Sequence, residues 1–317
     1  MNRTPQASPL LKSIKLVDQW DPVADVVLCH GDCLVLLAQM PPQSAQLIIT
    51  SPPYNIGKRY EKKHPFEDYL EGQRVVITAC ERILKDGGSI CWQVGNHIAG
   101  PSEIIPIDIA LFPIFKGLGL KMRNRIVWHF EHGLHCTKRF SGRYETIIWF
   151  TKGVNYHFDL DPVRVPQKYP GKRYYQGPKV GQYSANPLGK NPGDLWIIPN
   201  VKHNHVEKTA HPCQFPVELI ERLVLAMTKP GDLVFDPYMG VATTAVAAVL
   251  NGRRAAGAEI EAQYMAIGRQ RVLQAGAGML KTRPRNRQVY VPNPTSRIAQ
   301  RPPELGDPSR PVSRLFD

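Results

Sequence analysis

Short apolar runs alternate with segments of helical periodicity at both ends of the chain. In the first half the pattern predicts strands over residues 26–29, 46–50 and 89–94, and helices over residues 33–40 and 69–85. In the second half it predicts helices over residues 216–227, 243–250 and 264–273, and strands over residues 233–235 and 254–258. Strands that alternate with helices in this way predict a mostly parallel sheet with helices on its faces, an α/β fold.

The middle of the chain has a different character. Between residues 121 and 210 there are 15 Lys or Arg against six Asp or Glu, and Pro, Gly and Tyr are frequent. Residues 145–150 still have the composition of a core strand, so the rest of this stretch predicts an irregular, basic insertion.

Composition adds a partner and a compartment to this picture. The 317 residues carry a formal net charge of +13, which indicates a polyanionic partner because each neutralised phosphate releases counterions. A protein that is basic for no such reason is the alternative. The six cysteines show no CxxC pair or zinc-like cluster, so we expect reduced thiols and no metal. No signal peptide or membrane-spanning run is evident, which predicts a soluble, cytoplasmic protein.

Two acidic residues at strand ends predict a nucleoside site. Asp236 follows the strand over residues 233–235 and precedes a turn containing Gly240, which lets the backbone approach a ligand closely. Glu259 ends the next strand, where a carboxylate can accept both ribose hydroxyls. Either feature alone is common, and the pair together favours a cofactor site.

The tetrapeptide Ser51-Pro52-Pro53-Tyr54 predicts a catalytic turn. Two successive prolines fix the backbone and remove two donors, so nearby carbonyl oxygens and the Ser51 hydroxyl can accept hydrogen bonds from an exocyclic amine. The Tyr54 ring offers a face on which a flipped-out base can stack. A rigid turn without function is the alternative, and the apolar strand before it favours the site.

Together these motifs resemble the amino-group DNA methyltransferases with the permuted β-type motif order. LIITSPPYNIG at residues 47–57 is similar to their catalytic motif, and residues 211–249, which contain VFDPYMG, are similar to their cofactor-binding block. GAEI at residues 257–260 resembles their ribose-binding acid, and RYETIIWFTKG at residues 143–153 resembles a further core strand. The resemblance covers most of the chain, from residue 26 to residue 272.

The resemblance implies a Rossmann-like, class I S-adenosylmethionine-dependent methyltransferase fold, with a mostly parallel seven-stranded sheet and an inserted DNA target-recognition region. It implies that Ser51, Pro52, Pro53 and Tyr54 hold the target base. The residues that it implies for binding S-adenosylmethionine are Asp32, His211, Gln214, Pro216, Phe235, Asp236, Pro237, Gly240, Thr243 and Glu259.

The basic middle segment supplies candidates for binding double-stranded DNA. We expect four cations to contact phosphates and two tyrosines to stack on or beside the displaced base. These residues are Arg123, Arg125, Lys138, Arg139, Tyr174 and Tyr175. A solvated basic face is the alternative for each of them.

With these implications the chain divides into five parts. We expect an N-terminal arm over residues 1–25 and the catalytic half of the methyltransferase domain over residues 26–130. A core strand plus the target-recognition region follow over residues 131–210, then the cofactor-binding half over residues 211–276. A basic, Pro-rich, disordered tail is predicted over residues 277–317.

Two positions depart from the family's usual Phe-x-Gly-x-Gly after Asp-Pro. Tyr238 replaces the Phe, and Ala242 replaces the second Gly. If the turn requires a positive φ at residue 242, a methyl group there would crowd it, which predicts weakened cofactor binding at most.

The identity of the methylated base follows from one residue. In this family a serine before Pro-Pro-Tyr favours cytosine-N4, and Asp or Asn favours adenine-N6. Ser51 therefore predicts cytosine-N4 methylation, with adenine-N6 as the alternative, since a hydroxyl gives no physical reason to exclude adenine. We place the activity in a restriction-modification or orphan modification system. A cognate restriction endonuclease is a candidate partner, and monomer and homodimer both stay open.

Two further hypotheses come from other classes of protein. RNA and protein-glutamine methyltransferases use a similar Pro-Pro-Tyr turn, but there the cofactor loop precedes the catalytic turn, whereas here Asp236 follows Ser51. The third hypothesis is a catalytically inactive DNA-binding module, for which Ala242 is the one hint. Binding of S-adenosylmethionine separates that module from the enzymes.

Overall fold

The computed structural model describes residues 14–58, 61–100, 103–131, 133, 135–289, 293–297 and 300. Contacts divide the chain into two units, residues 1–286 and 287–317, and every helix and strand below belongs to the first. Residues 1–13 of the predicted arm and residues 301–317 of the predicted tail lie outside the described residues. Residues 277–286 belong to the first unit, in which Arg283 forms an ion pair with Glu218, so the tail predicted from residue 277 begins too early.

One sheet of nine strands runs through the described part of the first unit, in the order β1-β2-β11-β10-β3-β4-β8-β7-β9. Neighbouring strands are parallel except at β8, which is antiparallel to both β4 and β7. The prediction of a mostly parallel sheet is confirmed, and short edge strands raise the predicted seven strands to nine. The strands are β1 Leu16–Val17, β2 Val26–His30, β3 Ala45–Thr50, β4 Leu84–Val94, β7 Lys121–His129, β8 Tyr144–Thr151, β9 Leu195–Ile197, β10 Leu233–Asp236 and β11 Arg254–Glu259.

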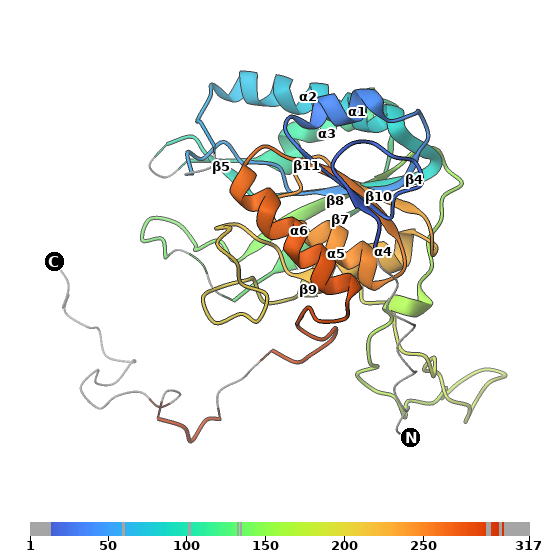
Figure 1. Cartoon of the computed structure of the whole chain (residues 1–317). Helices are drawn as coiled ribbons and strands as arrows, with labels where there is room; N and C mark the ends of the chain where they lie inside the picture. Colours follow the sequence, from blue (N-terminus) through green and yellow to red (C-terminus); the bar gives the residue numbers. More distant parts are fainter. Residues whose placement is uncertain are drawn as a thin grey trace, which may run out of the picture. The chain divides into compact units, whose positions relative to one another are not determined.

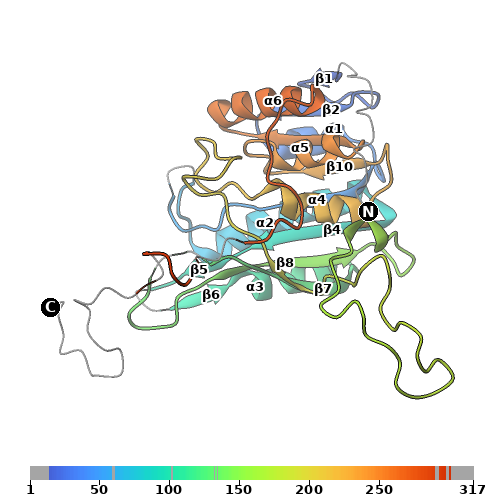
Figure 2. The same cartoon turned by 90° about the horizontal axis from the view of Figure 1, so that it is seen from below.

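Three helices of the described residues cover each face of this sheet (Figure 1). One layer contains α1 Cys33–Gln39, α2 Phe66–Ile83 and α3 Ile107–Gly117, and the other contains α4 Val217–Met227, α5 Thr243–Leu250 and α6 Ala262–Gly276. Seen from below, the strands follow one another from β1 at one edge to β7 near the other (Figure 2). A separate two-stranded ribbon pairs β5 Asn96–Ile98 with β6 Ile104–Pro106.

The apolar runs of the central strands are explained by burial on both faces. In β3, Leu47 and Ile49 pack on the side of α4–α6, whereas Ile48 packs on the side of α1–α3. A parallel strand covered by helices on both sides is continuously apolar, which is the pattern seen in these residues. No helix among the described residues combines the length and the apolar character needed to cross a membrane.

The order of the strands brings the two halves of the predicted site together. β3 and β10 are parallel neighbours, with Leu47 opposite Val234 and Ile48 opposite Phe235. Because their carboxyl ends share one edge of the sheet, the Ser51 turn and the loop after Asp236 leave from adjacent positions. We call this edge the catalytic edge below.

The middle segment, predicted to hold a core strand and the target-recognition region, divides between the two edges of the sheet. β8 starts at the catalytic edge and runs antiparallel to β4, so Thr151 lies opposite Ser89 near the amino ends of the parallel strands. Residues 152–192 therefore leave from the opposite edge, and they are drawn in green to yellow-green in Figure 1. The described parts of residues 131–143, and residues 198–210, adjoin the catalytic edge instead.

Candidate active site

The predicted catalytic turn opens on a large pocket at the catalytic edge. Ser51, Pro52, Pro53 and Tyr54 all line this pocket, whose volume is about 940 Å³. The Ser51 hydroxyl oxygen lies 3.0 Å from the Tyr54 hydroxyl. The structure therefore places a hydroxyl and an aromatic ring side by side at the end of β3.

A carboxylate fixes the loop that follows the turn. Glu61 accepts hydrogen bonds from the backbone amides of Asn55 and Ile56, each at 2.9 Å. Asn55 is buried with a φ of 56°, and its side chain exchanges two bonds with the backbone of His64. Because buried amides without partners are costly, Glu61 holds the backbone after Tyr54 in this conformation.

Two polar side chains that also line the pocket contact the Tyr54 hydroxyl. Tyr54 donates to Glu145 on β8 at 3.2 Å, and Gln93 on β4 donates to the Tyr54 hydroxyl at 2.8 Å and also to Glu145. Burial raises the pKa of Glu145, and the bonds from Gln93 and Tyr54 partly offset this. Burial, and then the Glu145 charge, also raise the pKa of Tyr54, which keeps its hydroxyl protonated.

Asp236 links the catalytic strand to the cofactor loop. Its carboxylate is buried and accepts from Thr50 at 2.5 Å, from Thr244 at 2.6 Å and from the Tyr238 amide at 3.0 Å. Desolvation raises the pKa of Asp236 to about 6, although these three hydrogen bonds oppose the shift. Thr50 and Asp236 are 186 residues apart in the chain, and their bond ties β3 to β10.

The loop after Asp236 turns tightly beside Glu259. Gly240 has a φ of 54°, and its amide donates to Glu259 at 2.8 Å. Ala242 has a φ of 60°, so the turn does require the left-handed conformation that glycine adopts most easily. Gly268 on α6 leaves room for the Ala242 methyl, since a Cβ at Gly268 would lie only 2.9 Å from it.

Seven of the ten predicted cofactor residues line the same pocket as the catalytic turn. They are Asp32, His211, Gln214, Pro237, Gly240, Thr243 and Glu259. Asp32 also begins α1 by accepting from the Leu34 amide at 2.8 Å. Burial, followed by the charges of nearby cations, lowers the pKa of His211 to about 4, so its imidazole is neutral near pH 7.

The other three predicted cofactor residues do not line this pocket. Asp236 is buried under the loop, as described above. Phe235 packs into the core on the side of α1–α3, because alternate residues of a strand face opposite sides of the sheet. Pro216 precedes the first turn of α4 and fixes the start of that helix.

The residues predicted to bind DNA lie in different places. Arg139 lines the pocket, and Lys138 beside it is exposed. Arg123 donates to Thr151 at 2.9 Å and stacks over Tyr156, and Arg125 forms a 2.5 Å ion pair with Asp108. These partners within the protein leave the phosphate contacts predicted for Arg123 and Arg125 without support.

The stacking predicted for Tyr174 and Tyr175 is also unsupported. Their side chains are 40% and 80% exposed, and they belong to the segment that leaves the opposite edge of the sheet. None of residues 152–192, all of which are described, lines the pocket. The basic and aromatic composition of this segment therefore does not place it at the displaced base.

Several residues that build the site were not predicted from the sequence. Gln93 and Glu145 end or begin core strands at the catalytic edge, and polar residues within apolar strands would have been the signal. Glu61 lies in a polar stretch that carries no pattern. Arg271, almost fully buried on α6, donates to Val241 O at 2.5 Å and to Thr243 Oγ1 at 2.9 Å, beneath the cofactor loop.

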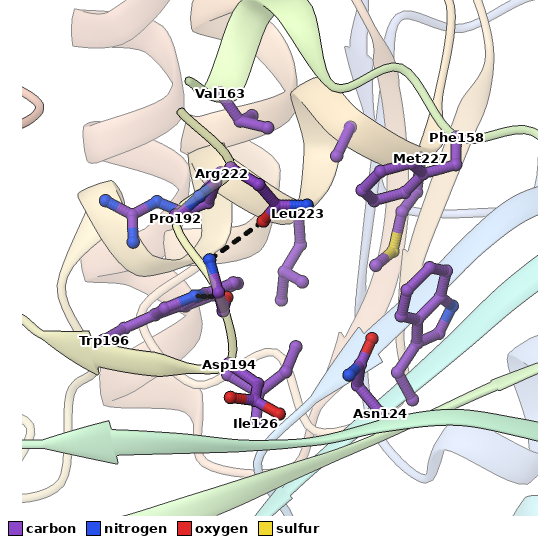
Figure 3. Close-up of a pocket in the computed structure, with 14 residues that line it drawn as sticks. Asn124, Ile126, Phe158, Val163, Pro192, Asp194, Trp196, Arg222, Leu223 and Met227 are labelled. Atoms are coloured by element: carbon purple, nitrogen blue, oxygen red, sulfur yellow. Dashed lines mark hydrogen bonds between the residues drawn. The ribbon is translucent and has the colours of Figure 1, made fainter. Parts of the chain in front are cut away.

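A second pocket of about 250 Å³ lies between α4, β7 and the segment before β9 (Figure 3). Trp196, Phe158 and Met227 supply much of its lining, with Arg222 stacked over the Trp196 ring. It contains none of the residues predicted for catalysis, cofactor or DNA. Among the described residues no group of three or more His, Cys, Asp or Glu is placed to hold a metal ion.

Comparison with known proteins identifies the family. A family model described as DNA methylase, for N6 and N4 methyltransferases, matches residues 45–270. The chain belongs to this amino-group DNA methyltransferase family. The resemblance noted in the sequence is therefore confirmed.

Relatives in the N6/N4 methyltransferase family share most of the chain. The Type II methyltransferase M.BglII of Bacillus subtilis is 52% identical over 241 residues, which covers 76% of this chain and 67% of that protein. The Type II methyltransferase M.ScaI of Streptomyces caespitosus is 39% identical, with 78% and 81% covered. The DNA adenine methyltransferase YhdJ of Escherichia coli K12 is 34% identical, with 77% and 82% covered.

Solved structures of N6/N4 methyltransferases confirm the fold and the cofactor. The cytosine-N4-specific PvuII DNA methyltransferase matches with a TM-score of 0.64 at 20% identity, over 85% of this chain and 95% of that one. A DNA modification methylase of Thermus thermophilus, in complex with S-adenosylmethionine, matches with a TM-score of 0.58 at 26% identity. The match covers 79% of this chain and 94% of that one. S-adenosylmethionine is the cofactor of this DNA methyltransferase. The pocket suits it, because the loop at Gly240 allows close approach and Glu259 can accept hydroxyls.

Proposed function

We propose that this DNA methyltransferase methylates the exocyclic N4 amine of cytosine at a specific DNA site. The observation that carries the proposal is the neutral Ser51 hydroxyl at the head of the Pro-Pro-Tyr turn. It lines the same pocket as Gly240 and Glu259 on the adjacent strand ends. A hydroxyl oxygen can accept a hydrogen bond from an amino group without presenting a full charge to it.

The residues of the pocket divide the chemistry between them. S-adenosylmethionine supplies an electrophilic methyl group on a sulfonium. Glu259, Asp32 and Thr243 line the cofactor side, where carboxylates accept hydroxyl and amine protons. On the other side, Tyr54 stacks on the extruded base and Ser51 accepts a hydrogen bond from its amine, which orients the nitrogen lone pair for attack. Catalysis on this view is positioning plus electrostatics.

Cations at the rim of the pocket are suited to hold the DNA backbone. Lys58, Lys62, Arg139 and Lys202 all line the pocket and come from three loops at the catalytic edge. Cations grouped at the mouth of a site attract phosphates and fix the duplex in place, while leaving sequence to other contacts. We place double-stranded DNA across this edge, so that the displaced base enters beside Tyr54.

Adenine-N6 methylation is the second candidate. The observation that favours it is the 34% identity to a protein named a DNA adenine methyltransferase. Nucleoside mass spectrometry separates the two, after incubation of unmethylated DNA with the protein and S-adenosylmethionine. N4-methylcytosine is the expected product; N6-methyladenine alone would replace the proposal by its alternative. Modification-aware sequencing of the same DNA gives the recognised site.

The placement of the target base is tested by substitution at the turn. Ser51→Ala and Tyr54→Ala are expected to abolish most transfer of tritiated methyl to DNA while keeping cofactor affinity, because neither contributes to the cofactor loop. Val35→Ala on the exposed side of α1 is the control. Near wild-type transfer by both turn variants would mean that the base binds elsewhere.

The similarity to Type II methyltransferases suggests a place in a restriction-modification system. In such a system we propose a cognate endonuclease that cuts the same site when it is unmethylated. Protection of DNA by this methyltransferase against endonucleases of the site found by sequencing is the expected result.

A further inference from the structure

A continuous chain of hydrogen bonds leads from the Ser51 hydroxyl to the carboxylate of Glu145. Ser51 Oγ lies 3.0 Å from the Tyr54 hydroxyl, which lies 3.2 Å from Glu145 Oε2. Gln93 Nε2 is within 2.8 Å of the same tyrosine hydroxyl and also donates to Glu145. Three elements, the catalytic turn, β4 and β8, therefore meet at one polar cluster in the lining of the pocket.

Glycine at residue 95 allows this cluster to form. A Cβ on Gly95 would lie 3.1 Å from the Tyr54 ring and 3.6 Å from Cγ of Glu145. The first separation is shorter than ordinary carbon contacts of about 3.5–4.0 Å. Any larger residue directly after β4 would push Tyr54 away from Glu145. The close approach of the two side chains therefore depends on this glycine.

The direction of the hydrogen bonds follows from what each group can donate. An ionised carboxylate only accepts, so the Tyr54 proton is directed to Glu145. The Gln93 amide uses one lone pair of the tyrosine oxygen, which leaves the other for the proton of Ser51. The Ser51 oxygen then keeps its own lone pairs for an N–H group in the pocket. Without the carboxylate, Tyr54 could donate to Ser51 instead and reverse this arrangement.

We propose that Glu145 sets this direction and is the final acceptor of the proton that the target amine releases. The inference rests on the proposed function and adds a positioning residue to it. As the amine nitrogen bonds to the methyl carbon, the carbon–sulfur bond breaks and the sulfur keeps its electron pair. The nitrogen passes a proton to Ser51, Ser51 passes its own to Tyr54, and Tyr54 passes its own to Glu145. Water removes that proton after product leaves.

The surroundings of Glu145 suit it to this task. Burial raises the pKa of its carboxyl, which makes the carboxylate a better base. The groups that oppose this are the hydrogen bonds from Gln93 and Tyr54, and the charge of Lys58 beyond the catalytic turn. On β7 the residue paired with Glu145 is the uncharged Trp128. The carboxylate therefore accepts a proton more readily than an exposed glutamate does.

Glu145→Gln tests the inference, because it keeps the size and loses the base. In single-turnover methyl transfer at about pH 7.5 we expect a loss of about 100-fold or more. The wild-type rate should fall at acidic pH as Glu145 becomes protonated. This acidic limb of the pH–rate profile should disappear in the variant. Glu145→Asp should restore part of the rate together with the limb. The exposed Glu71→Gln is the matched control and should behave as wild type.

A second variant tests the inference with Glu145 in place, and a spectroscopic readout tests it without measuring methyl transfer. Tyr54→Phe interrupts the chain, keeps the stacking ring and should also lose the acidic limb. Infrared difference spectra of the free protein, wild type minus Glu145→Gln, should show a carboxyl band that titrates above the ordinary glutamate pKa of about 4.3. A midpoint at or below that value would overturn the inference.

The outcomes distinguish the inference from the function on which it rests. Rates near wild type with an unchanged acidic limb in Glu145→Gln overturn the role of Glu145 and leave the methyltransferase proposal standing. A wild-type protein that methylates neither cytosine nor adenine contradicts the proposed function instead. In that case the infrared titration still shows whether the pKa of the Glu145 carboxyl is raised.

Discussion

Gly268→Ala probes how closely α6 supports the cofactor loop. A Cβ at residue 268 would lie 2.9 Å from the Ala242 Cβ and 3.3 Å from the carbonyl carbon of Val241. Because carbon atoms in contact normally lie about 3.5–4.0 Å apart, either the loop or the helix has to move by several tenths of an ångström. The backbone of the loop is one of the two contacts, so a change of side-chain rotamer alone cannot relieve the clash.

The expected magnitude combines two opposing effects. Overpacking of a well-packed interior costs about 1–3 kcal/mol, while replacing glycine by alanine inside a helix returns about 1 kcal/mol. We therefore expect the free energy of unfolding to fall by up to about 2 kcal/mol. The displaced loop contains Gly240, so the affinity for S-adenosylmethionine should fall as well, by about tenfold if about 1.4 kcal/mol of strain is carried into binding.

Ala242→Gly is the matched second substitution. It removes the nearest atom of the clash, and it relieves a left-handed conformation that costs an L-residue about 1–2 kcal/mol. The double variant should therefore recover most of the stability and the affinity, with a coupling free energy of about 1 kcal/mol or more. Denaturant unfolding and calorimetric cofactor titration of the four proteins measure both. If the effects of the two single substitutions sum to that of the double variant within about 0.3–0.5 kcal/mol, the proposed contact between residues 242 and 268 is refuted.

Three other contacts of the site give measurable effects. Glu61→Ala removes the acceptor of two backbone amides, at about 1–3 kcal/mol each, so those amides should exchange hydrogen faster; unchanged protection would contradict the role of Glu61. Because the folded pKa of His211 is lowered to about 4, its contribution to stability should be lost as pH falls from about 6.5 to about 4. In His211→Gln the free energy of unfolding should therefore change less with pH over this range. The same pH dependence in variant and wild type would contradict the role of His211. Arg139→Ala should reduce the salt dependence of DNA binding by about one phosphate contact, whereas Lys172→Ala on the opposite edge should not; equal effects would show that DNA contacts both edges.

Much of the fold could be predicted because burial determines which positions are apolar. The continuous apolar run of β3 and the small apolar residues of α5 need no knowledge of their neighbours. Since carboxyl ends of parallel strands share one edge, the meeting of Ser51 with Gly240 and Glu259 also followed. The catalytic turn and the cofactor loop were therefore accessible from local patterns and topology alone.

The region between β4 and β8 could not be predicted in the same way. α3 is apolar on most of its surface and contains Pro113, which hides its helical period. β7 carries Arg123 and Arg125 on its polar side, so it looked like part of a DNA-binding insertion. Their partners, Thr151 and Asp108, come from other elements, and only the folded chain shows that these cations are already engaged.

The polar groups of the site were the hardest part to predict. Tyr54 and Glu145 are 91 residues apart, and no local pattern indicates that a glutamate at the start of β8 bonds to the catalytic turn. Phe235 illustrates the opposite error. Its neighbour Asp236 belongs to the site, but adjacent residues of a strand face opposite sides, so Phe235 packs into the core instead.

The strand order has a consequence for synthesis of the protein. β2 and β3, the second and third strands to leave the ribosome, are separated in the sheet by β10 and β11, which are translated last. In a nascent chain that ends before β10, the sheet lacks its two central strands, so β2 and β3 each have an unpaired edge. The cofactor loop that follows β10, which lines part of the pocket, is also missing. Methylation therefore has to wait for nearly complete translation, and fragments broken between β9 and α4 should become active only when both pieces assemble.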